Sequence, residues 1–118
     1  MDGKRKDLKQ RTKMFARRII RLFLALPNKP APQILGKQVL RSGTSVGANY
    51  REASRARSKA EFIAKAGDCL KEIDETGYWL ELLVDEGFVP EKRMRSLCQE
   101  TEELIAIFTS IVKRSKCE

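Results

Sequence analysis

The sequence predicts an all-α protein in which four helices form an antiparallel bundle. Apolar residues recur at the three- and four-residue spacing of a helix through most of the 118-residue chain. No segment alternates apolar and polar residues with a period of two, and no two-residue hairpin turn joins apolar runs. Breaks in the pattern leave four segments with short connections, which favours antiparallel neighbours within a single domain, residues 1–118.

The first two segments meet at the sequence LPNKPAP, residues 26–32. Three prolines within seven residues must interrupt a helix, because proline lacks an amide hydrogen and clashes with the preceding turn. We therefore expect helices at about 5–26 and 32–56. On the first helix, Leu8, Phe15 and Ile19 share the face that should enter the core.

The last two segments carry start and stop signals. Ser58 is followed three residues later by Glu61, which is the spacing of a capping box. Gly87 stands where a helix would stop, and Pro90 suits the first turn of the next helix. The expected helices span about 59–86 and 91–114.

The segment RSGTSVGANYREA, residues 41–53, is rich in small residues for a helix interior. Gly43 and Gly47 lie one helical turn apart, and each costs about 1 kcal/mol relative to alanine. This cost is reasonable where a neighbouring helix must approach closely. A phosphate-binding loop does not fit, because the segment lacks both the Gly-Lys-Ser/Thr ending and a preceding strand. The segment is therefore predicted to be a closely packed helix.

Polar residues near the packed side of the second helix require hydrogen-bond partners. We predict a buried network in which Asn49 or Ser45 donates to Glu72. Arg41 has two alternatives, since it can face solvent or reach across a subunit boundary to Glu75. A catalytic pair of Glu72 and Glu75 is a weaker alternative, because carboxylates three apart on a helix are usually solvated. The predicted network consists of Ser42, Ser45, Asn49, Glu72 and Glu75.

Apolar residues outside the expected core faces predict a homo-oligomer. The third helix is apolar on several sides, and a helix of that kind is usually buried on several sides. Two apolar residues also interrupt the basic side of the first helix. The alternative is that bundle asymmetry and loops cover these side chains. The predicted interface residues are Ile20, Leu24, Tyr78, Trp79, Leu82 and Leu83.

Charge is distributed unevenly along the chain, whose formal net charge is +8. Residues 1–30 contain ten Lys or Arg against two acids, residues 31–59 six against one, and residues 60–90 two against eight. A basic half of this kind suits nucleic acid, an anionic membrane surface or acidic helices of another subunit. Few aromatics accompany these cations, which favours phosphate contacts over base stacking. The candidate nucleic-acid contacts are Lys6, Lys9, Lys13, Arg17, Arg18, Arg21, Lys37, Arg41, Arg51 and Arg55.

Residue types needed for common catalytic and metal sites are scarce. The chain has no histidine, and its three cysteines, Cys69, Cys98 and Cys117, match no ligand spacing. We therefore expect no metal, no cofactor and no enzymatic activity, with Cys69 a buried thiol. No apolar run approaches the roughly 20 residues of a bilayer span, and the first helix needs its apolar face for the core. A cytoplasmic protein without a membrane partner is expected, because the charged N-terminus lacks a signal-peptide core.

The sequence LRSGTSVGANYREA followed by EFIAKAGDCLKEIDETGYWLELL resembles the four-helix-bundle proteins named after the 23S rRNA intervening sequences in which some are encoded. The resemblance covers roughly residues 15–112. The paired motifs that carry it contain Arg41, Ser42, Ser45, Gly47, Asn49 and Glu52, and then Lys71, Glu72, Glu75, Trp79 and Leu80.

The resemblance implies a left-handed up-down-up-down bundle that assembles into a ring, most often a homopentamer. The family is also similar to accessory proteins of diversity-generating retroelements, which bind nucleic acid with a reverse transcriptase as protein partner. The family name reflects gene location rather than demonstrated rRNA binding. The resemblance therefore implies the fold more directly than the function.

Three classes of function are compatible with these features of the sequence. The leading prediction is a non-enzymatic homo-oligomer, expected to be pentameric, that binds RNA or DNA through the basic faces of its first two helices. The second is an interaction scaffold whose basic face docks an acidic protein, or a family member without nucleic-acid binding. The third is an enzyme with its site at Glu72 and Glu75, which would require an internal pocket lined by these carboxylates.

Overall fold

The computed structural model describes the backbone of residues 2–117 and the side chains of residues 7–115. This part of the chain consists of four α-helices without strands, which confirms the all-α prediction. They are α1 (Asp2–Leu24), α2 (Pro30–Ser54), α3 (Lys59–Asp85) and α4 (Glu91–Cys117). Their ends differ from the expected ones by three residues at most. Within the same residues, no helix has both the length and the apolar character needed to cross a membrane.

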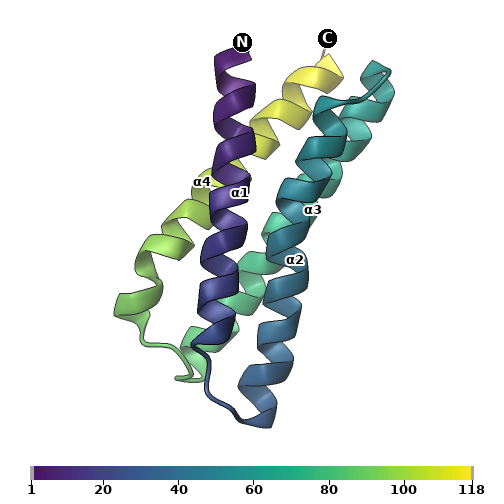
Figure 1. Ribbon diagram of the computed structural model, residues 1–118. Helices are drawn as coiled ribbons and strands as arrows, with labels where there is room; N and C mark the ends of the chain where they lie inside the picture. Colours follow the sequence, from purple (N-terminus) through teal and green to yellow (C-terminus); the bar gives the residue numbers. More distant parts are fainter. Residues whose placement is uncertain (1, 118) are drawn as a thin grey trace.

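Consecutive helices run in opposite directions along an elongated molecule with extents of 46 × 21 × 21 Å (Figure 1). The α1–α2 and α3–α4 connections lie at one end, and the α2–α3 connection lies at the other with both ends of the chain (Figure 1). α2 packs closely against α1 and α3, and α3 packs against α4. Long side chains join α1 to α4, as in the hydrogen bond from Arg11 to Glu100. The left-handed arrangement of the bundle stays a prediction.

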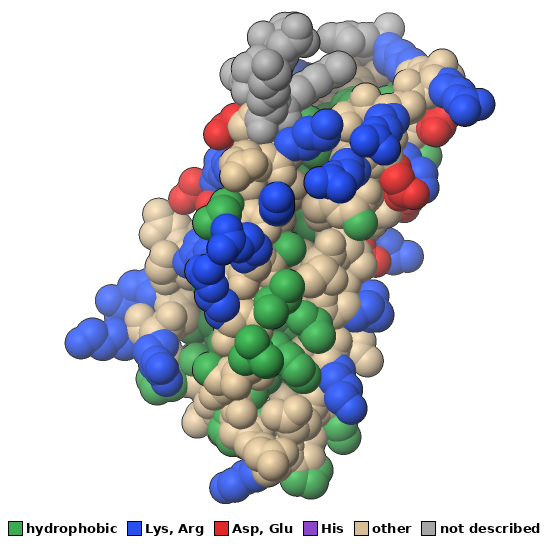
Figure 2. All heavy atoms as spheres, viewed as in Figure 1, with side chains coloured by type: hydrophobic (Ala, Val, Ile, Leu, Met, Phe, Trp, Pro, Cys, Tyr) green, Lys and Arg blue, Asp and Glu red, His purple; other side chains and the backbone are tan. Residues whose placement is uncertain are grey.

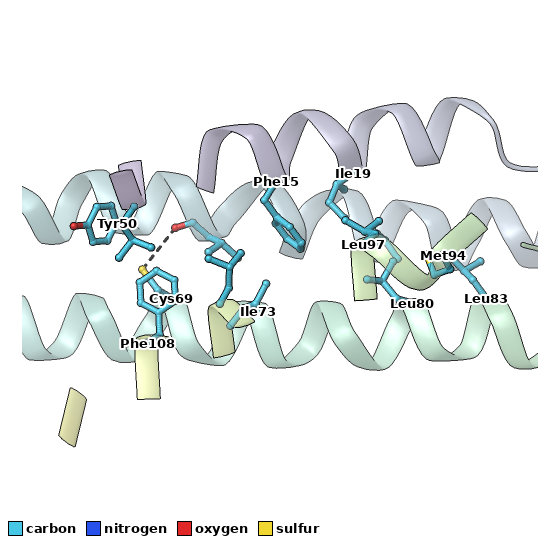
Figure 3. Close-up of a cluster of buried hydrophobic side chains, with 14 of the residues drawn as sticks. Phe15, Ile19, Tyr50, Cys69, Ile73, Leu80, Leu83, Met94, Leu97 and Phe108 are labelled. Carbon is cyan, nitrogen blue, oxygen red and sulfur yellow. Dashed lines mark hydrogen bonds between the residues drawn. The ribbon is translucent and has the colours of Figure 1, made fainter. Parts of the chain in front are cut away.

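The core follows the helical spacing of apolar residues (Figure 3). Phe15 and Ile19 of α1 are fully buried, as are Ile73 of α3 and Phe108 of α4. Tyr50 of α2 packs edge-on against Phe108, with ring centroids 5.9 Å apart. Burying each large apolar side chain of this kind contributes about 1.5–3 kcal/mol, so this shared interior holds the four helices together.

Gly43 and Gly47 of α2 face α1, in agreement with the prediction that a neighbouring helix approaches segment 41–53 closely. A Cβ atom at Gly43 would lie 2.7 Å from Ile19 Cγ1, and one at Gly47 would lie 3.4 Å from the carbonyl oxygen of Thr12. α1 therefore approaches α2 more closely at position 43 than an alanine would allow without movement. Close helix packing, rather than a phosphate-binding loop, explains these glycines.

The ends of α3 use the chemistry expected of them. Ser58 Oγ accepts a hydrogen bond from the Glu61 amide at 3.1 Å, which caps the helix. The Glu61 carboxylate accepts from the amide of Arg57 at 3.2 Å instead of from Ser58, so the second half of the capping box is shifted by one residue. Gly87 has φ +75°, the left-handed conformation in which many helices end. Pro90 directly precedes α4.

One predicted interface residue belongs instead to the core. Leu83 is completely buried within the subunit, so its assignment to an oligomer interface is wrong. It lies three residues after Leu80, and the buried face of α3 is wide enough to include both positions. Trp79 and Leu82 are half-buried. The predicted interface residues that are exposed are Ile20, Leu24 and Tyr78.

Candidate nucleic-acid interface

Four exposed cations form a row along α1. Lys9, Lys13, Arg17 and Arg21 follow one another at intervals of four residues, or about 6 Å along the helix axis. Four residues advance slightly more than one turn, so the row drifts around α1 from the side of α2 toward the side of α4. Figure 2 shows Lys and Arg side chains gathered over α1. The side chain of Lys6, another predicted contact, lies outside the described side chains.

The first half of this row lines a groove between α1 and α2 of about 490 Å³. Lys9 and Lys13 come from α1, and Arg51 and Arg55 come from α2. The side chains between them are short, which leaves space between the two pairs of cations. These short residues are Thr12, Ala16, Thr44, Gly47 and Ala48. The structure thus brings four predicted contacts from two helices onto one groove.

The groove is strongly cationic. Its acidic lining residue is Glu52, whose carboxylate pairs with Lys65 at 3.4 Å. None of the ion pairs among the described side chains involves the four groove cations. The lining contains no aromatic side chain. The groove therefore suits phosphate groups and offers no surface for base stacking.

Arg41 lies on a different side of α2 and is neutralised there. Its guanidinium donates to Glu72 Oε2 at 3.3 Å and to Glu75 Oε2. The hydrogen bond to Glu75 is the larger cause of a raised pKa at Arg41, and Glu72 adds to it. Arg41 is exposed, as the first predicted alternative has it, and its partners Glu72 and Glu75 belong to the same chain, whereas the second alternative placed Glu75 across a subunit boundary. Arg41 is consequently a poor candidate for a phosphate contact.

The predicted network around Glu72 is also wrong. Ser45 Oγ donates to the carbonyl oxygen of Arg41 at 2.6 Å, one turn earlier on α2. Helical serine hydroxyls often form this local bond, and Arg41 supplies the donor that Glu72 requires. Asn49 is half-buried and, within the described side chains, does not donate to Glu72. Glu72 and Glu75 thus form an ion-pair cluster with Arg41 at the edge between α2 and α3.

A threonine makes the buried polar contact between α2 and α3. Thr76 Oγ1 donates to Ser42 Oγ at 2.8 Å, and both side chains are fully buried. Ser42 in turn donates to the carbonyl oxygen of Gln38 at 2.9 Å. Ser42 was expected to need a buried partner, but Thr76 was not proposed as that partner. The sequence offered one indication, because Thr76 lies at helical spacing among the apolar residues of the core face of α3 and should therefore be buried there.

Two further arginines were missed by sequence reasoning. Arg11 donates to Glu100 at 3.1 Å through Nε and to Glu103 at 3.2 Å through Nη2, and the hydrogen bond to Glu100 is the main cause of its raised pKa. Arg11 lies beside the core face of α1, and this position could have indicated that it pairs with a carboxylate of a neighbouring helix. Arg93 lines a second pocket with Arg18 and Arg21. It was overlooked because residues 91–118 are nearly neutral overall.

Two remaining basic predictions stand apart from the groove. Arg18 donates to Ser96 Oγ of α4 at 2.9 Å, which directs it toward the α4 side of α1. Lys37 is exposed near the start of α2 and does not line the groove. The groove itself therefore contains Lys9, Lys13, Arg51 and Arg55.

Cys69 is a buried thiol, as predicted. It is fully buried, and its Sγ lies 3.6 Å from the carbonyl oxygen of Val46 (Figure 3). Burial raises the pKa of this thiol to about 12 and also raises that of Cys98. Among the described residues, no three His, Cys, Asp or Glu side chains form a group that could hold a metal ion. The side chain of Cys117 lies outside the described side chains.

The chain matches a known protein family over most of its length. Residues 4–110 match the family described as 23S rRNA-intervening sequence protein. The chain belongs to this family. It is also similar to a crystal structure of a protein with unknown function from the S23 ribosomal protein family of Bacteroides thetaiotaomicron VPI-5482. The TM-score is 0.86 at 41% sequence identity, covering 93% of this chain and 98% of that one. No match was found among curated proteins.

Membership of the 23S rRNA-intervening sequence protein family confirms the resemblance seen in the two motifs. The similar crystal structure is described as a protein of unknown function, so it supports the fold and leaves the activity open. The further relation to accessory proteins of diversity-generating retroelements stays a prediction.

Proposed function

We propose that this member of the 23S rRNA-intervening sequence protein family is a non-enzymatic, homo-oligomeric protein that binds nucleic acid. Phosphate groups would occupy the groove between α1 and α2. The observation that carries the proposal is the convergence of Lys9, Lys13, Arg51 and Arg55 on one groove, where no carboxylate of the described side chains pairs with any of them. Four such cations attract a polyanion and release its counterions on binding.

The composition of the groove defines the kind of recognition. Its short side chains carry few hydrogen-bonding groups, so the groove has little with which to distinguish one base from another. Binding at the groove would therefore be directed at the backbone, weakly dependent on sequence and steeply dependent on salt. One subunit with four phosphate contacts gives a slope of roughly −3 to −4 in log K against log salt.

The oligomeric part of the proposal is supported by exposed apolar side chains on two helices that α2 separates. Ile20 and Leu24 of α1 are 42% and 76% exposed, and Tyr78 of α3 is 55% exposed. Two different surfaces that pair head to tail form heterologous contacts, which close into a ring when the rotation between neighbouring subunits closes. We propose a homopentamer, the assembly that the family resemblance implies. A ring would repeat the groove and multiply weak contacts with one nucleic acid.

Binding of labelled duplex DNA and structured RNA, measured by fluorescence anisotropy across a salt series, tests this proposal. The wild-type protein should bind at low salt and lose affinity steeply as salt is added. The double variant Lys13→Glu, Arg51→Glu should bind at least tenfold more weakly, with a slope of log K against log salt that is shallower by about 2.

A reverse transcriptase is the protein partner to test first, on the basis of the proposed relation to retroelement accessory proteins.

The matched control is the double variant Lys59→Glu, Lys71→Glu. It makes the same change in net charge at two exposed positions of α3 that do not line the groove. It should retain most of the wild-type affinity. Equal losses in both variants would show that only the total charge matters and would overturn the groove assignment. Absence of binding even at low salt would overturn the function and favour the docking of an acidic protein.

A further inference from the structure

A second pocket lies between α1 and the start of α4 and has a volume of about 300 Å³. Arg18, Arg21 and Arg93 contribute its charge, and apolar side chains that include Phe88 and Met94 contribute the rest. Its lining contains no acidic residue, and none of the ion pairs among the described side chains involves these arginines. The pocket therefore combines three positive charges with an apolar surface. Such a site suits a ligand that has both an anionic and an apolar part.

Phe88 is held in this pocket by the turn that ends α3. It follows Gly87, and its amide donates to the carbonyl oxygen of Leu83 at 3.0 Å. The next residue, Val89, is buried in the core, whereas Phe88 is half-buried and lines the pocket. The backbone thus fixes the position of Phe88 in the chain, and Phe88 lines the pocket together with the three arginines.

A row of positively charged side chains on α1 connects the groove to the pocket. The row of cations on α1 begins at Lys9 and Lys13, which line the groove, and ends at Arg21, which lines the pocket. Arg17 lies between them and is exposed. Figure 2 shows Lys and Arg side chains over α1 and again over the start of α4. A chain of phosphates that entered the groove could follow this row to the pocket.

We propose that the pocket binds one unpaired nucleotide of the strand that occupies the groove. The base would lie against Phe88 and the neighbouring apolar side chains, and the adjacent phosphates would contact Arg18, Arg21 and Arg93. This inference rests on the proposed function and adds to it a preference for single-stranded nucleic acid. It also identifies a stacking position that the groove does not provide.

The requirement for an unpaired base follows from the shape of the site. A base within a duplex has both faces covered by its neighbours and cannot offer one to a recessed aromatic ring. A single strand exposes its bases, and stacking on an aromatic side chain is tolerant of base identity because every base has a π face. Arginine planes next to the ring can contact the base and the phosphate at once.

The variant Phe88→Leu tests the stacking contact. Leucine keeps an apolar side chain in the pocket but removes the aromatic face. We expect affinity for a 12-nucleotide single strand to fall roughly five- to hundredfold, while affinity for a duplex of the same length stays unchanged. A single strand carrying 2-aminopurine should lose fluorescence on binding to the wild-type protein and lose less on binding to the variant. The variant Arg93→Glu, at an exposed position, should weaken single-strand binding in the same selective way.

The matched control is Phe62→Leu, which makes the same change at a half-buried position of α3 outside the pocket. It should leave single-strand binding and quenching unchanged, and thermal melting checks that all variants fold. Single-strand binding and quenching that survive in both Phe88→Leu and Arg93→Glu would overturn this inference while the groove proposal stands. Equal affinity of the wild-type protein for single strand and duplex would also overturn it. Absence of binding to either form at low salt would overturn both proposals.

Discussion

At Gly43 the distance between α1 and α2 depends on the absence of a single carbon atom. A Cβ there would lie 2.7, 3.0 and 3.3 Å from three atoms of the Ile19 side chain. Ile19 is fully buried, so it has little room to move away. At Gly67, in contrast, a Cβ would meet no atom within 4 Å. The two glycines have the same cost in helix propensity, but only the position of Gly43 lacks room for a Cβ atom.

Alanine substitutions at these positions should therefore have effects of opposite sign. Gly43→Ala should lower the free energy of unfolding by about 1–2 kcal/mol, because the clash with Ile19 exceeds the gain in helix propensity. Gly67→Ala should raise it by about 0.5–1 kcal/mol, because only the propensity gain applies. Urea denaturation followed by circular dichroism measures both. A stabilising Gly43→Ala would show that α1 and α2 can separate at little cost.

Cys69 should make stability depend on pH at the alkaline end. Its thiol pKa is raised from 9.0 to about 12 by burial. The unfolded chain therefore ionises first, so stability is fully present below pH 9 and is lost as pH rises toward 12. A Cys98→Ser, Cys117→Ser protein should also react slowly with a thiol reagent at pH 8, and rapidly once unfolded in urea.

The control for this prediction is Cys69→Ala, which should lose stability less steeply over the same pH range. Equally fast labelling of the folded and unfolded protein would contradict the burial of this thiol.

At the scale of whole helices, α1 is held to its two neighbours by different forces. Against α2 it packs through glycines and buried apolar side chains, as at Gly43 and Ile19. Against α4 the shared apolar core is supplemented by Arg11, whose guanidinium bonds Glu100 through two nitrogen atoms and also reaches Glu103. A two-point hydrogen-bonded pair of this kind is stronger than an ordinary surface ion pair.

Arg11→Met should reveal how much this contact contributes. Methionine keeps an apolar stem against the bundle but removes the guanidinium. We expect the free energy of unfolding to fall by about 1–2 kcal/mol at low salt and by less at high salt. Denaturant titration at two salt concentrations measures this effect. Glu103→Gln, at a more exposed partner, should cost less than half as much. An unchanged Arg11→Met protein would show that apolar contact alone holds α1 against α4.

At the scale of the whole molecule, the surface is divided between charge and exposed apolar side chains. Lys and Arg side chains follow α1 and the groove, whereas Ile20 and Leu24 interrupt that surface near the end of α1. Ile34 on α2 and Tyr78 on α3 are also more than half exposed. The proposed homo-oligomer of this 13.5 kDa chain would cover apolar side chains of this kind.

The mass in solution tests the proposed homopentamer. Light scattering coupled to size exclusion should give a mass near five times 13.5 kDa for the wild-type protein. Leu24→Glu places a charge at a side chain that is 76% exposed in one subunit, and should yield smaller species that keep their helical circular dichroism. Ala64→Glu, at an exposed position of α3, should assemble like the wild type. A monomeric wild-type protein at tens of micromolar would contradict the proposed ring.

Local signals explain which structural predictions succeeded. Proline at the α1–α2 connection, the Ser58 cap and the Gly87 turn act within a few residues, so the sequence shows them directly. The burial of Phe15 and the exposure of Lys13 follow from helical spacing for the same reason.

The errors concern contacts between helices. Leu83 was placed at an interface because a period of 3.6 residues does not show how wide a buried face is. The sequence does not predict that exposed Arg41 pairs with Glu72 and Glu75 of its own chain, because spacing along α2 does not identify the residue opposite on α3. Thr76 was missed as the partner of Ser42 for the same reason.

The sequence by itself determined the four helices, their approximate ends, their apolar faces and the basic character of the first half of the chain. These properties depend on local backbone chemistry and on composition. Only the tertiary structure decided which cations share a groove, which are neutralised by carboxylates, and that Arg93 and Phe88 join Arg18 and Arg21 around a second pocket. The reason is physical: the rotation and spacing of packed helices are set by many side chains acting together, and no short stretch of sequence contains that information.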